Sequence, residues 1–247
     1  MMRRFFVQPE DVHAPRLRLT GAEAAHLIHV LRMGPGAQIS AFDGCGREYV
    51  AVVERLAPEG VLCHIVQQLD AQPMTAVPIS LGQGLPKADK FEWVIQKTTE
   101  LGVTEVVPLA TERVVPQIPT ARMAAKQARW EKIAREACKQ CGRATVPRIR
   151  PPTPLGAFFS TFQDADLKLV LWEGEQTRHL RTILTAGDRP ASIALVIGPE
   201  GGLTPREVAQ GESYGFLPVG LGERILRTET ASLVAVTLLQ YRFGDLG

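Results

Sequence analysis

The chain has 247 residues, 45% of them hydrophobic, and a net charge of +2, which suits one large globular domain or two ordinary ones. No apolar run approaches the roughly 18 residues that a membrane-spanning helix needs. The basic N-terminal residues are followed at once by Gln8, Pro9, Glu10 and Asp11, so we expect no signal peptide and a cytoplasmic protein. Four cysteines are too few for a disulfide framework.

Positive charge is concentrated in one stretch of the chain. Residues 113–150 contain ten Lys or Arg residues and only two Asp or Glu residues, whereas the remaining residues have 18 basic against 24 acidic side chains. This asymmetry predicts a polyanionic partner for the basic stretch.

The first 72 residues predict a small β-rich domain. Thr20-Gly21-Ala22-Glu23 has the spacing of a capping box and predicts a helix that continues through Leu31 and ends at Gly34-Pro35-Gly36. Alternating apolar residues predict strands around this helix, over residues 3–7, 16–19, 38–42, 48–56 and 61–69. Strands with a single helix indicate a small β-barrel.

A second domain is predicted over residues 73–247, because residues 70–78 contain two prolines and little periodicity. Strands and helices then alternate, which indicates a mostly parallel sheet covered on both faces. Strands are expected at 79–81, 103–109, 167–172, 193–197 and 216–219, and helices at 91–101, 120–141, 180–184, 205–213 and 229–242. From connection rules alone we expect an open, doubly wound sheet.

Two glycine-bearing loops follow the last two predicted strands. The first, Gly198-Pro199-Glu200-Gly201-Gly202, precedes a helix with Thr204 as N-cap, Pro205 at the first position and Glu207 three residues after the cap. It matches neither the Walker A pattern nor the dinucleotide fingerprint. Glu200 argues for a ligand that is neutral or cationic at this point, although a simple tight turn would also explain the glycines.

The second loop spans residues 221–231 and crowds Arg224, Arg227 and Glu229 among apolar side chains. Leu217, Leu221 and Leu226 could hold a flat heterocycle while the backbone binds its edge. Arg227 is the best candidate to face a substrate, and the alternative is a surface arginine that acts as a cap or pairs with Glu229. Because strand ends of open α/β sheets bind ligands, the two loops predict one pocket.

The predicted helix 120–141 has one basic side and one apolar side. Helical spacing gathers Arg122, Lys126, Arg129, Lys132, Arg135 and Lys139 on the first side, with Arg143 just beyond it, and Trp130, Ile133, Ala134, Ala137, Cys138 and Cys141 on the second. The basic side indicates contacts to nucleic-acid phosphates, and a merely solvated surface is the alternative.

Cys138 and Cys141 form a C-x-x-C pair without the second pair that a zinc site needs, so we expect no metal. The five histidines (13, 26, 29, 64 and 179) form no metal-ligand spacing and no triad. A reaction that needs little proton chemistry fits this inventory best.

The two loop motifs together resemble the signature of the 16S rRNA uridine-N3 methyltransferase family (small-subunit rRNA methyltransferase E), which belongs to the SPOUT superfamily. Supporting matches extend over the whole chain. They are Arg3 to Val7, His26 with Val30-Leu31-Arg32, Gln96-Lys97 with Glu100 to Val103, Thr111-Glu112-Arg113, Gln140 to Arg143, and Arg242 to Leu246.

The resemblance implies an α/β protein: a C-terminal SPOUT-type domain with a deep trefoil knot, preceded by an N-terminal PUA-like RNA-binding barrel. It also implies a homodimer that binds S-adenosyl-L-methionine (SAM) in the knot loops. By motif position the cofactor-binding residues are Leu171, Trp172, Ile197, Gly198, Pro199, Glu200, Gly201, Gly202, Leu217, Val219, Gly220, Leu221, Ile225 and Leu226.

The implied activity is methylation of N3 of a specific uridine in 16S rRNA, within the small ribosomal subunit. Arg227 would stabilise the anionic base, and Glu229 would either orient Arg227 or accept the proton. The residues expected to hold rRNA phosphates are Arg3, Arg4, Arg32, Arg122, Lys126, Arg129, Lys132 and Arg143. The alternatives are a SPOUT enzyme acting on another RNA atom, such as a ribose 2′-hydroxyl, and a noncatalytic RNA-binding assembly factor.

Overall fold

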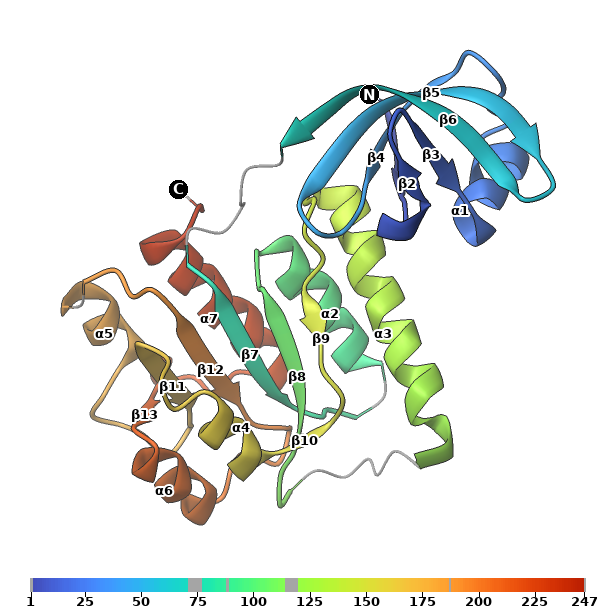
Figure 1. Ribbon diagram of the computed structural model, residues 1–247. Coiled ribbons are helices and arrows are strands. Elements are labelled where there is room, and N and C mark those ends of the chain that lie inside the picture. The colour runs from blue at the N-terminus through green and yellow to red at the C-terminus, as the bar shows by residue number, and fades with distance from the viewer. Residues whose placement is uncertain (1, 71–76, 88, 114–119, 187, 247) are drawn as a thin grey trace. The chain divides into compact units, whose positions relative to one another are not determined.

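The structure is a computed structural model that describes residues 2–70, 77–87, 89–113, 120–186 and 188–246 (Figure 1). Two compact units divide the chain. The first comprises Met1–Met74 and Arg135–Val146, and the second comprises Thr75–Ala134 and Pro147–Gly247. The boundary predicted between residues 72 and 73 lies outside the described residues and stays a prediction.

The first unit is built on a six-stranded sheet in the order β1-β4-β5-β6-β3-β2. Its strands are β1 (Arg3–Phe6), β2 (Val12–His13), β3 (Arg16–Leu19), β4 (Gln38–Phe42), β5 (Arg47–Ala57) and β6 (Gly60–Asp70). Irregularities at Val50/Ala51 and Val53/Arg55 interrupt the register of β5 with β6, and such bulges increase the bend of a sheet. Alternate residues, among them Phe5, Leu17 and Ile39, face a buried core. The β-rich first domain is therefore confirmed.

The helix of this unit begins where it was predicted, but it does not use the predicted cap. Helix α1 (Gly21–Ala25) continues as a π-helical turn over His26–Val30, and Thr20 makes no capping hydrogen bond with its side chain. The Thr20 hydroxyl donates to Asp11 at 3.3 Å instead. Glu23 accepts from the Phe6 N–H at 3.3 Å and pairs with Lys139 at 2.9 Å. The capping-box prediction was wrong because partners distant in sequence engage both side chains.

The second unit contains a parallel sheet in the order β10-β8-β7-β12-β11-β13, with β9 beside β8. Its strands are β7 (Ile79–Gly84), β8 (Glu105–Ala110), β9 (Arg148–Ile149), β10 (Thr153–Pro154), β11 (Leu167–Leu171), β12 (Ile193–Ile197) and β13 (Leu217–Val219). Its helices are α2 (Lys90–Glu100), α3 (Thr120–Cys141, which continues into the first unit), α4 (Leu155–Thr161), α5 (Leu180–Ala186), α6 (Pro205–Ser213) and α7 (Thr228–Phe243).

Helices cover both faces of this sheet, as predicted. Helix α2 packs against α7, and α4 packs against α6 (Figure 1). Along the fully buried strand β12, Ala194 and Val196 face an aromatic core that contains Phe158, Phe159 and Phe216. Sequence patterns missed α4, β9 and β10, which are short and carry no clear periodicity.

The connection to the last helix crosses the sheet. Strand β13 pairs with β11, whereas α7, which follows β13, packs against α2 and β12. Residues 220–227 therefore carry the chain back past the end of β11. The deep knot implied by the resemblance stays a prediction. Among the described residues, no helix has the length and apolarity required to cross a membrane.

Candidate functional site

A cavity of about 820 Å³ lies where β11, β12 and β13 end. These three strands are neighbours in the sheet, so the loops that follow them meet at one edge. The lining residues are Lys90, Leu171, Trp172, Glu173, Glu175, Gln176, His179, Ile197, Gly198, Pro199, Glu200, Gly202, Val219, Gly220, Leu221, Gly222, Glu223, Arg224, Ile225, Leu226, Arg227, Thr228 and Ala231. The two loops thus form one pocket.

The first loop is held in place by the start of α6 and by the end of β7. The Thr204 hydroxyl accepts from the Glu207 N–H at 3.2 Å, and Glu207 accepts from the Thr204 N–H at 2.8 Å, so the predicted capping box is confirmed. At the end of β7, a Cβ on Gly84 would lie 2.5 Å from the Pro199 nitrogen. Gly84, which sequence reasoning missed, therefore lets this loop approach the strand.

Lys90, at the start of α2, connects the first loop to α7. Its Nζ lies 3.2 Å from Glu200 and 3.4 Å from Glu229. Glu200 also accepts from the Lys87 N–H at 3.0 Å. Burial raises the pKa of Glu200, but hydrogen bonds from backbone N–H groups and from Lys90 outweigh it and lower the pKa overall. Glu200 is thus an anion already paired within the protein.

The second loop presents Arg227 to the cavity. Arg227 is the N-cap of α7 and is exposed at the cavity wall. The guanidinium of Arg227 makes no hydrogen bond or ion pair with the described residues. Glu229, its expected partner, pairs with Lys90 instead. The expected alternative, an arginine paired with Glu229, does not occur in the structure. The cation of Arg227 is available to a ligand.

A third wall, residues 173–179, was not predicted. Gly220 donates its N–H to Arg178 at 2.8 Å, and the Leu180 N–H donates to Gly220 at 2.9 Å, so this segment lies along the end of β13. Glu175 accepts from the Thr177 hydroxyl and from two backbone N–H groups, which lowers its pKa to about 2. In the sequence, the only signals that this segment lines a site are its acidic residues and His179.

Twelve of the fourteen residues expected to bind a cofactor line the cavity, and Gly201 and Leu217 do not. The Gly201 carbonyl accepts from Arg113 at 2.9 Å, outside the cavity lining. Leu217 begins the edge strand β13 and is 38% exposed. The tertiary arrangement of the loops, and not the local sequence, decides which residues face inward.

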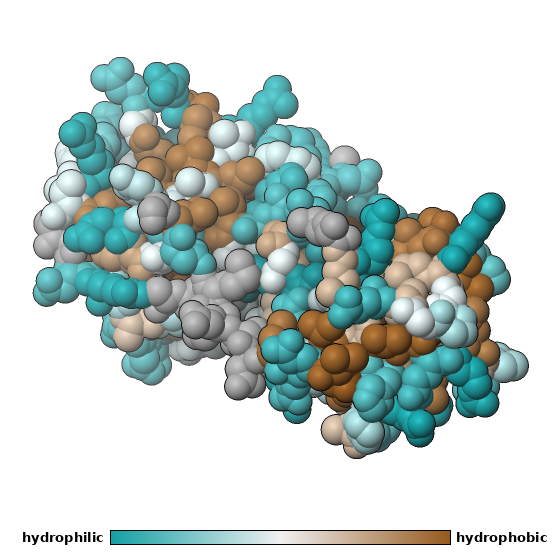
Figure 2. Space-filling view, turned by 90° about the horizontal axis from the view of Figure 1, so that it is seen from above, coloured by the Kyte–Doolittle hydropathy of each residue, from teal (hydrophilic) through white to brown (hydrophobic). Residues whose placement is uncertain are grey.

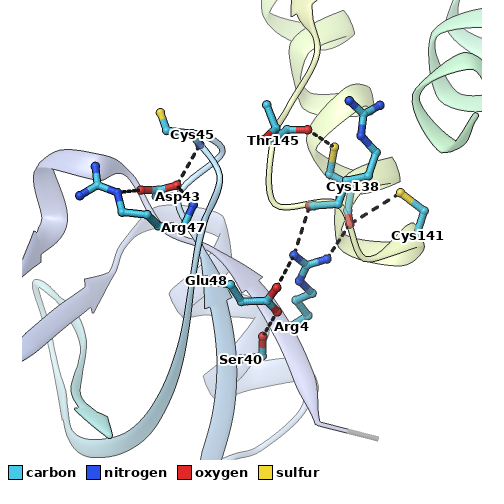
Figure 3. Close-up of polar contacts among 10 residues, drawn as sticks. Arg4, Ser40, Asp43, Cys45, Arg47, Glu48, Cys138, Cys141 and Thr145 are labelled. Carbon is cyan, nitrogen blue, oxygen red and sulfur yellow. Dashed lines mark hydrogen bonds and ion pairs between the residues drawn. The ribbon is translucent and has the colours of Figure 1, made fainter. Parts of the chain in front are cut away.

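Two of the residues expected to hold RNA phosphates, Arg4 and Arg143, have little exposed surface in the first unit, and Figure 3 shows the contacts of Arg4. Arg4 donates to the carbonyls of Cys138 at 3.0 Å and Arg143 at 3.1 Å, and it pairs with Glu48 at 3.2 Å. Arg143 is only 2% exposed. Arg4 thus adds a second N–H donor to the Cys138 carbonyl, which also accepts from the Gly142 N–H, and it binds the Arg143 carbonyl just beyond the end of α3. Arg4 and Arg143 are therefore not placed to hold RNA phosphates, and this part of the prediction was wrong.

The other basic residues remain accessible. Arg3, Arg32, Arg122 and Lys132 are exposed, and Lys126 is half-buried with its ammonium 5.9 Å from the centre of the Trp130 ring. Arg129 pairs with Glu92 at 2.7 Å. As predicted for the apolar side of α3, Trp130, Ala134, Ala137 and Cys138 are buried.

Apolar residues also reach the surface of the molecule. Figure 2 shows them as groups among hydrophilic side chains.

The cysteines differ in accessibility. Among the described residues, no group of three His, Cys, Asp or Glu side chains could hold a metal ion. Burial raises the pKa of the Cys63 and Cys138 thiols to about 12, whereas Cys45 is exposed. At about pH 8, iodoacetamide is therefore expected to alkylate Cys45 first and to leave Cys63 and Cys138 unmodified until the protein is unfolded. Peptide mass spectrometry checks this, and early labelling of Cys138 would contradict it.

The chain matches family models over most of its length. Residues 73–240 match the model of an RNA methyltransferase domain, and residues 19–66 match that of an RNA methyltransferase PUA domain. The ribosomal RNA small subunit methyltransferase E of Bacillus subtilis is 33% identical over 98% of this chain and 97% of its own length. That of Buchnera aphidicola from Acyrthosiphon pisum is 38% identical over 98% and 94%.

Solved structures agree with these matches. A putative methyltransferase from Legionella pneumophila, solved with bound SAM, has a TM-score of 0.91 and 36% identity, with both chains covered completely. A ribosomal RNA small subunit methyltransferase E from Neisseria gonorrhoeae, bound to SAM, has a TM-score of 0.88 and 32% identity, again over both whole chains. Similarity in sequence and fold thus extends over both units, and the chain belongs to the RNA methyltransferase family that contains the ribosomal RNA small subunit methyltransferase E proteins.

Proposed function

We propose that this protein uses SAM to methylate N3 of a specific uridine in 16S rRNA of the small ribosomal subunit. The observation that carries the proposal is the cavity formed by both motif loops at the ends of three adjacent strands. Similar structures over the whole chain were solved with SAM bound, which supports the same cofactor here.

The cavity fits SAM in size and in charge. Its volume of about 820 Å³ falls within the roughly 300–1,000 Å³ of small-molecule sites. Among the described residues, four acidic and three basic side chains line the cavity, and this excess of negative charge suits a cationic ligand. The loop glycines let such a ligand approach the backbone. The residues proposed to hold the cofactor are the twelve predicted ones that line the cavity.

When bound, SAM supplies a methyl group on a sulfonium that is already activated for transfer. The protein then has to orient the two reactants, which alone can lower the barrier substantially. Arg227 is exposed at the cavity wall and has no hydrogen-bond or ion-pair partner among the described residues. It would stabilise negative charge on the uracil as N3 loses its proton.

The contacts of Glu229 bear on its two expected roles. It pairs with Lys90, so no contact supports the role of orienting Arg227. Its Oε2 atom is buried and has no hydrogen-bond partner among the described residues, but Glu229 is not among the lining residues. Acceptance of the N3 proton by Glu229 therefore stays a prediction.

Mass spectrometry of rRNA from cells with and without the gene tests the proposed function. We expect one 3-methyluridine to disappear from 16S rRNA in the deletion strain and to return on complementation. Loss of a 2′-O-methyl group instead would favour the alternative SPOUT reaction. An unchanged set of modifications would contradict an enzymatic role and leave RNA binding as the activity.

We further propose that the protein acts in the cytoplasm as a homodimer. Trp93 on α2 and Leu238 and Tyr241 on α7 are large apolar residues with 42%, 36% and 70% exposure. The two helices pack against each other, and exposed apolar groups of this kind mark association surfaces. Light scattering of the purified protein checks the oligomeric state, and a monomeric mass would contradict the proposal.

The basic side of α3 is expected to bind RNA phosphates. Arg122, Lys126 and Lys132 are suited to a test, because they have no ion-pair partner recorded among the described residues, unlike Arg129. Changing all three to Glu should weaken rRNA binding and reduce its salt slope by roughly one unit per lost phosphate contact. The matched control changes the exposed Arg181, Arg189 and Arg206 to Glu, with the same change in net charge. An equal effect of both variants on the slope would contradict a specific role of α3.

A further inference from the structure

A buried amide at the end of β7 lies between the two loops that line the cavity. Gln83 has no exposed surface. Its Nε2 donates to the Thr228 hydroxyl and to the Gly84 carbonyl, each at 2.9 Å. Its Oε1 accepts from the hydroxyl of Ser232, which is also fully buried. Sequence analysis assigned no role to any of these three side chains.

The Thr228 hydroxyl extends this connection to the first loop. It accepts from Gln83 and donates to the carbonyl of Gly198 at 2.5 Å, and Gln83 Nε2 itself lies 3.4 Å from the same carbonyl. Gly198 opens the first loop, whereas Thr228 is the first residue of α7 and directly follows Arg227. One chain of hydrogen bonds therefore joins β7, the first loop and the start of α7.

The chemistry of this position requires an amide. Gln83 donates to Thr228 and Gly84 and accepts from Ser232, and an amide offers the two N–H donors and the carbonyl acceptor that these three bonds need. An apolar residue of similar size would remove the donor to the Thr228 hydroxyl and the Gly84 carbonyl and the acceptor for the Ser232 hydroxyl, and buried hydrogen bonds left unmade are costly in free energy. A carboxylate would place negative charge against the Gly84 carbonyl.

We propose that Gln83 is a positioning residue for the methyl transfer. Through Thr228 it fixes the first loop relative to the start of α7, so that the bound cofactor and Arg227 are held in one geometry. This inference rests on the proposed function, because it assumes that the first loop binds SAM and that Arg227 faces the base. Gly198, Arg227 and Thr228 all line the cavity, so a shift between them changes its shape.

A matched set of hydroxyl variants tests the role. Thr228→Val keeps the shape and removes the hydroxyl, whereas Thr228→Ser keeps the hydroxyl. Thr98→Val is the control, since Thr98 is also fully buried but its hydroxyl bonds, among the described residues, only to the Val94 carbonyl of its own helix, at 2.7 Å. SAM dissociation constants from calorimetry, kcat and KM on rRNA, and melting temperatures are measured for each.

Thr228→Val is expected to weaken SAM binding and to lower kcat, each by about tenfold, the size expected for a buried hydrogen bond left unmade. Thr228→Ser should restore both to within about threefold, and Thr98→Val should change the melting temperature but neither SAM binding nor kcat. If Thr228→Val lowered only the melting temperature, as Thr98→Val does, the positioning role would be wrong.

Gln83→Leu, alone and with Thr228→Val, completes the test. The two losses should be strongly non-additive, because both variants break the same connection. Additive losses would overturn the inference. If Gln83→Leu does not fold, the comparison of Thr228→Val with Thr228→Ser decides whether the positioning role is correct. Wild-type protein that neither binds SAM nor methylates rRNA would refute the proposed function itself. Active wild type with a fully active Thr228→Val variant would refute only the positioning role.

Discussion

Arg227→Ala is expected to lower methyl transfer by about 10²–10³-fold while SAM affinity stays within about threefold of wild type. Arg227 lines the cavity, is exposed there, and its side chain makes no hydrogen bond or ion pair with the described residues. Its removal therefore disturbs little of the protein, but it takes away the cation that we propose opposes charge on the uracil. Single-turnover rates on rRNA, together with calorimetry for SAM, separate the two effects.

Arg206→Ala serves as the control for this prediction, since Arg206 is an exposed arginine on α6 that does not line the cavity. It should retain normal rates. Arg227→Lys should recover only part of the activity, because an ammonium lacks the planar pair of donors that a guanidinium offers to a base edge. Near-normal turnover of Arg227→Ala would show that another group stabilises the base.

Ala231→Trp is expected to weaken SAM binding by at least about a hundredfold. Ala231 lies in the first turn of α7 and lines the cavity, so an indole at this position would fill space that the cofactor needs. The change leaves the hydrogen bonds of Thr228 and Ser232 in place. The variant should therefore fold, but its melting temperature should no longer rise when SAM is added.

Ala209→Trp is the matched control for the cavity, because it places the same side chain on the exposed surface of α6. It should bind SAM as wild type does. Normal SAM binding by Ala231→Trp would mean that the cofactor occupies a different site. Loss of binding by both variants would indicate a general effect of the added tryptophan.

The two loops could be found from the sequence because their signals are local. The predicted strands 193–197 and 216–219 appear as apolar runs, and the cap at Thr204 needs only Glu207, three residues away. The carboxyl ends of parallel strands meet at one edge of a sheet. This rule places the loops together without any knowledge of side-chain packing, and the cavity lies there.

The contacts of individual side chains could not be found in this way. Arg4 looks like a surface residue beside Arg3, yet two carbonyls at and just beyond the end of α3, and the carboxylate of Glu48 on β5, lie within its reach. The sequence around Glu200 and Glu229 does not indicate that both pair with Lys90, which precedes them by more than a hundred residues in the chain. Such pairings depend on how distant segments approach each other, and a local pattern does not encode that.

Periodicity, caps and glycine spacing act over a few residues, so they were enough to predict the β-rich first domain, the alternating second domain, the family resemblance and the two loops at the strand ends. The position of Gly201 outside the cavity lining, the third wall formed by residues 173–179 and the link that Gln83 makes between the loops emerged from the fold alone. Burial and hydrogen-bond partnership depend on the folded arrangement, in which a neutral strand residue such as Gln83 becomes the contact point between two distant loops.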